Sequence, residues 1–304
     1  MLRLAAGVSY CDLQFQSRPR IVAAALLDGA GGAAIVDPGP SSTLPALRAA
    51  LATAGLSMRD VTTLLLTHIH LDHAGATGVL VRENPALRVY VHERGAPHLV
   101  DPSRLLASAT LLYGDAMERL WGEVSPVPAS ALMVLKGGER IDAGGRPFEV
   151  AYTPGHASHH VSYFNADTGI AFVGDTAGIK IVENGYVLPP TPPPDINLEA
   201  WDESLRTIEG WRAETLFLTH FGPYGAASAL IAELRDHLAL AADLVKTSLA
   251  RDEPDEQREQ WFSEELRREL RRRLADAEGR SYEIAGRLDL SWRGLARYWR
   301  KKNQ

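Results

Sequence analysis

The sequence contains a single cysteine, Cys11, so no disulfide can form within the chain. A chain without disulfides is typical of the cytoplasm, where thiols stay reduced. No run of eighteen or more apolar residues occurs, which argues against a membrane-spanning helix. The first residues, Met1–Val8, carry one early arginine and soon give way to alternating polar and apolar residues, so we expect no secretory signal peptide. These absences predict a cytoplasmic protein.

An excess of basic charge is also lacking. The 304 residues carry 32 Lys and Arg against 38 Asp and Glu, a formal net charge of −6. An acidic chain is not typical of nucleic-acid-binding proteins. With 45% hydrophobic residues the chain can form a core, and its length suits one large or two smaller domains. We therefore expect a folded protein whose partners include neither a membrane nor a nucleic acid.

The most informative segment is Thr67–Gly75, which directly follows the apolar, β-branched run Val61–Leu66. Such a run is typical of a buried strand, so the polar cluster lies where a strand ends and a loop begins. In an extended loop, alternate side chains point the same way, so His68 and His70 can converge on one ion while the next polar residues face another. Imidazole and carboxylate are ligands that zinc, iron and manganese accept. A surface histidine cluster is the competing interpretation, and the strand context disfavours it.

Three further polar residues each end a short apolar run that is typical of a strand: His156, Asp175 and His220. With the loop they make seven candidate metal ligands: His68, His70, Asp72, His73, His156, Asp175 and His220. Seven ligands are too many for one tetrahedral ion, but they suit two ions that share a bridging carboxylate. The sequence therefore predicts a binuclear metal site.

These motifs resemble, in their order, those of the metallo-β-lactamase fold superfamily. The matching segments are His68-Ile69-His70-Leu71-Asp72-His73, Gly155-His156, Gly174-Asp175 and Thr219-His220. The resemblance covers roughly residues 5–240. It implies that His68, His70 and His156 hold a first metal, that Asp72, His73 and His220 hold a second, and that Asp175 bridges them. The superfamily includes lactamases, thioesterases of the glyoxalase II kind, lactonases, phosphodiesterases, nucleases and sulfatases, so the motifs leave the substrate open.

Four residues near the motifs are candidates for the substrate pocket or for orienting the ligands: His159, His160, Tyr163 and Tyr224. Proteins similar to glyoxalase II have a histidine at the position of His160, which implies a hydrogen-bonding role behind the ligands. His159 stands where that pattern has a glycine, and a pocket-lining and a surface position explain it equally well. The two tyrosines are close to the motifs in sequence only, so neither is assigned as a general acid.

The order of predicted elements favours two sheets between helical layers. Strands are predicted at Gly7–Gln16, Ile21–Leu27, Ala33–Val36, Val61–Leu66 and Arg88–His92, and a hairpin pairs Val161–Asn165 with Ile170–Gly174. Helices are predicted from Leu44 to near Gly55 and over Ala74–Arg82. Strands that precede helices in two halves fit an αββα sandwich better than a purely parallel sheet.

Two segments without metal motifs are predicted to shape the pocket. Glu93–Pro128 is typical of a helical insertion, and Val187–Asp195 contains five prolines that stiffen an extended loop before a helix near Leu198. Long loops at the catalytic edge of a sheet often determine specificity. A packed helix pair and a plain spacer explain these two segments equally well.

The end of the chain has a different composition, with fourteen basic and twelve acidic residues between Arg251 and Gln304. We expect a catalytic domain at residues 1–245 and a C-terminal helical extension at 246–304, packed on that domain or on a partner subunit in a homo-oligomer. Its basic clusters are interpreted as a solvated helix face rather than as a nucleic-acid contact. Burial is expected for apolar residues that would otherwise form an exposed patch: Leu266, Leu270, Leu274, Trp292 and Trp299.

We expect a hydrolase in which a metal-bridged hydroxide, oriented by Asp72, attacks a small carbonyl ester, thioester or lactone. Asp175 resembles the bridging residue of glyoxalase II and lactonases, whereas the β-lactamases of the superfamily usually lack a carboxylate there. A phosphodiesterase or nuclease and a β-lactamase are the alternatives, and a diiron oxidoreductase is less favoured. The histidine-rich ligand set favours zinc, with iron or manganese as alternatives.

Overall fold

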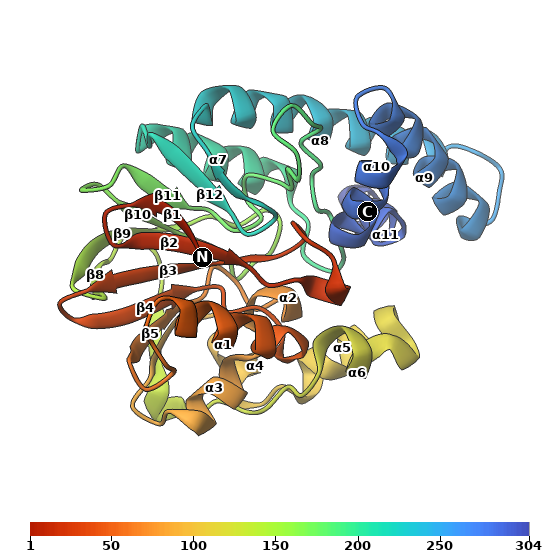
Figure 1. The fold of residues 1–304 in the computed structure, drawn as a ribbon. Helices are drawn as coiled ribbons and strands as arrows, with labels where there is room; N and C mark the ends of the chain where they lie inside the picture. The colour runs from red at the N-terminus through yellow and green to blue at the C-terminus, as the bar shows by residue number, and fades with distance from the viewer. Residues whose placement is uncertain (304) are drawn as a thin grey trace.

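Two mixed sheets lie face to face in the computed structural model, which describes residues 1–303 (Figure 1). The strands of the first sheet are adjacent in chain order: β1 (Leu2–Ala5), β2 (Val8–Asp12), β3 (Ala23–Gly29), β4 (Gly32–Val36), β5 (Val61–Leu65), β6 (Arg88–His92) and β7 (Leu132–Leu135). The second sheet runs from β13 (Gly222–Tyr224) through β12 (Thr215–Leu218), β11 (Ile170–Phe172), β10 (Val161–Asn165) and β9 (Arg146–Tyr152) to β8 (Arg140–Ala143).

Helices cover the outer faces of both sheets, with α1 and α3 on one side and α7 and α8 on the other (Figure 1). The helices are α1 (Leu44–Thr53), α2 (Leu71–Ala74), α3 (Thr77–Glu83), α4 (Ala96–Val100), α5 (Ser103–Tyr113), α6 (Met117–Trp121), α7 (Leu198–Gly210), α8 (Ala227–Leu249), α9 (Asp255–Arg271), α10 (Asp276–Gly286) and α11 (Leu288–Lys302). The predicted αββα sandwich is confirmed.

The alternation of side chains along β3 explains why the sheets are covered on both faces. Ala23, Ala25 and Leu27 join the core between the sheets, whereas Ala24 and Leu26 join the core beneath the helices. Successive strand residues point to opposite faces, so a strand that is apolar throughout must be buried on both. This burial holds the ends of the central strands in place, and those ends carry the polar motifs.

The predicted strand Gly7–Gln16 is too long, because β2 ends at Asp12. The Asp12 carboxylate accepts hydrogen bonds from the backbone N–H groups of Gln14 (2.9 Å) and Arg20 (2.6 Å), which turns the chain out of the sheet. This turn rests on a contact eight residues away, so strand periodicity does not reveal it.

The predicted helix Ala74–Arg82 is two helices, α2 and α3. The N–H of Ala76 donates to the carbonyl oxygen of Gly39 (2.9 Å), outside the helix, and this breaks the helical ladder. The hairpin strand predicted over Ile170–Gly174 also ends early, at Phe172, because Gly174 adopts a φ of 47°. Both differences come from the way the chain enters or leaves the edge of the sheet that carries the motifs.

The C-terminal helices α9, α10 and α11 pack together, and α9 and α11 also pack on α8 of the same chain. Four of the five residues expected to be buried are buried: Leu266, Leu270, Leu274 and Trp292. Trp299 is only half-buried, although its indole N–H donates to the carbonyl oxygen of Ala242 (2.9 Å). The expected boundary at residue 245 falls inside α8, so that helix belongs to both parts of the proposed division.

Among the described residues, no helix has the length and apolar composition that crossing a membrane requires. Cys11 is buried, and burial raises the pKa of its thiol to about 11. The thiol is therefore protonated at neutral pH and does not serve as a nucleophile.

Candidate metal centre and active site

The loop after β5 starts from a firm hydrogen-bonded anchor. Asp37, just beyond β4, accepts hydrogen bonds from Thr67 at Oδ1 (backbone N, 2.8 Å) and at Oδ2 (Oγ1, 2.7 Å). Because β4 and β5 are parallel neighbours, their carboxyl ends meet at one edge of the sheet. The chain then turns at His70 into the short helix α2, which carries Asp72 and His73. One turn of helix thus brings the second half of the motif back over the first.

The first group of candidate ligands is His68, His70 and His156, whose ligand atoms all lie within 4.8 Å of one another. The Nε2 atoms of His68 and His156 each lie 2.9 Å from His70 Nδ1. His156 comes from the segment after β9, so the two sheets contribute to this group together. Three imidazole nitrogens facing one point are the donor set of a tetrahedral zinc site with one open position.

The second group is Asp72, His73 and His220, and its ligand atoms also lie within 4.8 Å of one another. Asp175 lies between the two groups. Its Oδ1 is 3.2 Å from His73 Nε2, and its Oδ2 is 3.4 Å from His156 Nε2. One carboxylate oxygen therefore faces each group, as a bridging ligand must.

The buried atoms at the centre of this cluster lack partners within the protein. His73 Nε2, His220 Nε2 and Asp175 Oδ1 are buried and make no hydrogen bond of ordinary geometry among the described residues. An unpaired buried polar group costs about 1–3 kcal/mol. A divalent ion at each group would accept these lone pairs and remove that cost. The residues present therefore fit two divalent ions.

The first group is electrically neutral. Burial lowers the pKa of His68 and of His70 well below the ordinary value, and neighbouring imidazoles lower it further. Burial also lowers the pKa of His156. Neutral imidazole is the form that binds a metal, so these side chains are ready to act as ligands.

The second group combines imidazoles with buried carboxylates. Burial alone would lower the pKa of His73, but the carboxylates around it, Asp175 foremost, raise it well above the ordinary value. Burial would raise the pKa of Asp175, but the facing imidazoles of His73 and His220 outweigh burial and hold it well below its usual range. The Asp72 and Asp175 carboxylates are stabilised in their ionised form only by nearby positive charge, which divalent ions supply.

Three ligand candidates are oriented through Nδ1, which donates a hydrogen bond and leaves Nε2 to face the cluster: His73 to Asp37 Oδ2 (2.8 Å), His156 to the carbonyl oxygen of Pro190 (2.8 Å) and His220 to the carbonyl oxygen of Ile21 (2.6 Å). Such orienting partners fix the tautomer of a ligating histidine. Sequence reasoning missed Asp37. Its signal was present, because Asp37 ends the apolar strand Ala33–Val36 just as Asp175 ends its own.

His160 is fully buried directly behind Asp175. Its Nδ1 lies 3.0 Å from Thr153 Oγ1 and 3.1 Å from Thr176 Oγ1, and its Nε2 accepts a hydrogen bond from the Asp175 N–H (3.3 Å). This arrangement supports the orienting role expected for it. His159, by contrast, lines the pocket over the cluster.

Tyr163 and Tyr224 do not line that pocket, which corrects their candidacy as substrate residues. Tyr163 is buried between the sheets, where its hydroxyl donates to the carbonyl oxygen of Leu66 (2.8 Å). The Tyr224 hydroxyl donates to the carbonyl oxygen of Lys180 (2.5 Å).

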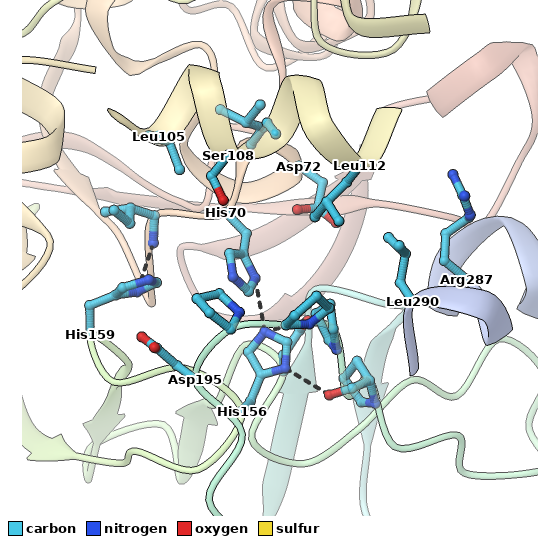
Figure 2. Close-up of a pocket in the computed structure, with 18 of the residues that line it drawn as sticks. His70, Asp72, Leu105, Ser108, Leu112, His156, His159, Asp195, Arg287 and Leu290 are labelled. Carbon is cyan, nitrogen blue, oxygen red and sulfur yellow. Dashed lines mark hydrogen bonds and ion pairs between the residues drawn. The ribbon is translucent and has the colours of Figure 1, made fainter. Parts of the chain in front are cut away.

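A pocket of about 260 Å³ opens over the ligand candidates. In Figure 2, Leu105 and Ser108 of α5 lie above His70, and Leu112 of the same helix lies beside Asp72. The other walls come from the proline-rich segment and from the C-terminal helices: Pro190, Pro192, Pro193, Pro194, Asp195, Ala285, Gly286, Arg287 and Leu290. Both segments expected to shape the pocket do line it. The C-terminal contribution was not expected.

Residues 17–220 match the sequence profile of the metallo-beta-lactamase superfamily. A metallo-beta-lactamase fold-containing protein of Sulfurisphaera tokodaii is 32% identical over 162 residues, which are 52% of this chain and 60% of that protein. A hydroxyacylglutathione hydrolase of Legionella pneumophila strain Lens is 31% identical over 155 residues, 50% of this chain and 46% of that protein. The alignments thus span about half of the chain and less than two thirds of these relatives.

The fold as a whole is similar to that of a metallo-beta-lactamase family protein of Thermus thermophilus. The two structures superpose with a TM-score of 0.72 over 99% of this chain and 95% of the other, at 24% sequence identity. At this identity the likeness establishes the fold alone. It extends over the C-terminal helices, which the family profile does not reach.

Proposed function

The chain belongs to the metallo-beta-lactamase superfamily of metallohydrolases, and from this premise we propose that it is a binuclear hydrolase of small carbonyl esters, thioesters or lactones. The observation that carries the proposal is the position of Asp175, with one oxygen toward each group of candidate ligands. The hydroxyacylglutathione hydrolases among its relatives support hydrolysis of an acyl group.

Under this proposal His68, His70 and His156 hold one ion, Asp72, His73 and His220 hold the other, and Asp175 contacts both. Zinc is the expected metal, given the number of imidazoles. Bound divalent ions supply the Lewis acidity that acidifies water and polarises a carbonyl oxygen. The protein's own groups then have to orient the water and hold the substrate.

Asp72 is suited to orient the attacking water. Both carboxylates line the pocket, but the side chain of Asp72 is 23% exposed against 5% for Asp175, so Asp72 is the more accessible one. Burial raises the pKa of Asp72, but the imidazoles of His73 and His220 outweigh burial and lower it to about 2. The carboxylate is therefore ionised at neutral pH and can accept a hydrogen bond from water.

The remaining expectations are also proposals. The substrate is a small molecule that enters the pocket over Asp72. The single, buried cysteine supports a cytoplasmic location. The division into a catalytic domain and a C-terminal helical extension is supported by the packing of α9, α10 and α11 against one another.

The test is an activity panel with protein loaded separately with zinc, manganese and iron. Thioesters, carboxylic esters, lactones, β-lactams and phosphodiesters are compared at equal concentration, with chelator-treated protein as the control. We expect metal-dependent hydrolysis of an ester, thioester or lactone to give the highest kcat/KM. Faster cleavage of a phosphodiester or a β-lactam would overturn the proposed substrate class.

A further inference from the structure

A second pocket, of about 450 Å³, meets the first one beside Asp72. The two share five lining residues, namely Asp72, Tyr113, Trp121, Ala285 and Arg287. The first pocket also borders His70 and His156, whereas the second also borders His220. The ligand cluster is therefore open toward two chambers, which we call the first and the second chamber.

The first chamber has apolar walls on the sides of α5 and α11, and Arg94, Arg104 and His159 also line it. Leu105 and Leu112 of α5 lie on one side, and Leu290 of α11 lies on another (Figure 2). The proline-rich segment, beginning at Pro190, adds further apolar surface without N–H donors. A pocket of this composition stabilises an apolar group, by about 0.8 kcal/mol for each buried methylene.

The second chamber has both apolar and charged walls, and its charged residues are three arginines and three carboxylates: Arg119, Arg267, Arg287, Asp72, Glu283 and Asp289. Arg267 donates hydrogen bonds to Glu283 (3.0 Å from Nη2 to Oε2), so this pair is neutral overall. Arg119, on α6, contacts the side-chain oxygen of Gln16 (3.1 Å) and forms no ion pair among the described residues. The chamber therefore has a cation that a negatively charged group can approach.

Arg287 lies where the chambers meet, at the corner between α10 and α11. Its φ is 41°, a left-handed conformation that is uncommon for a residue other than glycine and that is found at functional sites. Its Nε and Nη2 bind the carboxylate of Asp289 (2.9 and 2.6 Å), and its Cζ lies 5.5 Å from the centre of the Tyr113 ring. Nη1 donates to no acceptor among the described residues, so it is free to bind a ligand.

We propose that the corner formed by residues 285–290 is a specificity element that divides the site, so that the substrate is an open-chain ester or thioester with an apolar acyl group in the first chamber and a polar, anionic leaving group in the second. This inference rests on the proposed function. Water adds to the carbonyl carbon, the C–O or C–S bond breaks, and one proton passes to the leaving group. Arg287 and Arg119 bind the anionic group before and after this step.

The apolar chamber is tested with a series of acetyl, butyryl, hexanoyl and octanoyl thioesters. We expect kcat/KM to rise about fourfold for each added methylene until the chamber is filled. Leu112→Asp should flatten this series. Leu111→Asp is the matched control, because Leu111 is the next residue of the same helix, is 86% exposed and does not line either pocket. Equal chain-length series in the two variants would overturn the assignment of the first chamber.

The polar chamber is tested with two octanoyl thioesters, of 3-mercaptopropionate and of its neutral amide. We expect the KM of the anionic compound to be roughly 10- to 100-fold lower than that of the neutral amide, because a hydrogen bond between charged groups contributes free energy of this size. Arg287→Gly should reduce the preference without backbone strain, because glycine adopts positive φ freely and only Arg119 then remains to bind the anion. Arg293→Ala is the control, since Arg293 lies on α11, the helix that follows the corner, and pairs with Glu259 away from both chambers. A uniform loss with both compounds would mean a structural role, and would overturn the proposal.

A binding measurement separates this inference from the proposed function. Calorimetry with octanoate and metal-free protein should detect binding that Leu112→Asp abolishes and Leu111→Asp retains. If the metal-loaded protein hydrolyses no ester or thioester but octanoate binds in this way, the proposed function fails and the first chamber is retained. If instead the rate of hydrolysis does not depend on chain length and octanoate does not bind, the assignment of the first chamber as an acyl site is wrong and the proposed hydrolase activity stands.

Discussion

Two regions that border the same pocket, the loop at 67–75 and the corner at 285–290, are built in different ways. In the loop, His68 and His73 are fully buried and Asp37 holds both Thr67 and His73 by hydrogen bonds. In the corner, Arg287 is half-buried and its position depends on the packing of α10 against α9 and α11, which in turn pack on α8. The chemical groups are held by buried hydrogen bonds between side chains and backbone, whereas the pocket wall is held by the packing of helices. Changes in the two regions should therefore have separable effects.

Asp175→Asn should produce the largest effect, because it removes the one carboxylate that faces both groups of ligands. Metal content should fall from about two ions per chain toward one, and kcat/KM should fall by more than the about 100-fold seen for outer-sphere changes. Elemental analysis and turnover measure both. Asp167→Asn, in the exposed turn between β10 and β11, is the control. A metal content that Asp175→Asn leaves unchanged would refute the bridging role.

Trp292→Ala should destabilise the packing of the C-terminal helices that supports the corner at 285–290. The indole is 3% exposed, and its N–H donates to Ser248 Oγ (2.8 Å) across the contact between α11 and α8. Its loss should cost about 3–5 kcal/mol of unfolding free energy. Denaturant titration measures this cost, and Trp299→Ala, at a half-buried site on the same helix, should cost less. Metal content should be retained, and a loss of metal in folded Trp292→Ala would show that the two regions are not separable.

Asp37→Asn tests whether the loop depends on its anchor. Asp37 accepts hydrogen bonds from Thr67, His73 and Thr219, and an amide, with one acceptor oxygen, cannot accept them all. We expect metal affinity to fall by roughly 10- to 100-fold with the fold intact. Competition with a chelator measures the affinity. Asp28→Asn, at the exposed opposite end of the neighbouring strand, should have no effect, and equal affinities in the two variants would exclude the anchoring role.

His237→Gln should have the smallest effect, a change in how stability depends on pH. His237 lies on α8, the helix on which α9 and α11 pack. Burial lowers the pKa of His237 below its unfolded value of about 6.5, and its Nδ1 donates to the carbonyl oxygen of Val187 (2.8 Å). Between the lowered native pKa and about 6.5, His237 binds a proton more readily in the unfolded chain than in the folded protein. The stabilisation that neutral His237 provides is therefore complete above about pH 6.5 and is lost as the pH falls through this range. Melting temperatures of wild type and variant from pH 7.5 to 5 should converge toward low pH. Parallel curves would contradict the assignment.

The metal cluster could be predicted because its members lie at the ends of apolar strands. His156, Asp175 and His220 come from distant parts of the chain, but each follows a run that must be a buried strand, and such strands deliver their ends to one edge. Asp37 followed the same pattern and was missed, because a single carboxylate before Pro38 is also typical of a turn. Tyr163 shows the converse error, since closeness in sequence to a motif does not determine the face to which a strand residue points.

The sequence by itself determined the elements, the sandwich they form and the set of polar groups at the strand ends, because apolar periodicity and strand-end motifs are local signals. Only the tertiary structure decided which groups face one another, that Asp175 lies between the two groups of ligands, and that Ala285, Arg287 and Leu290 form part of the pocket. The physical reason is that the C-terminal corner reaches the cluster through the packing of α9 and α11 on α8. No motif records such packing, because many apolar residues could supply it equally well.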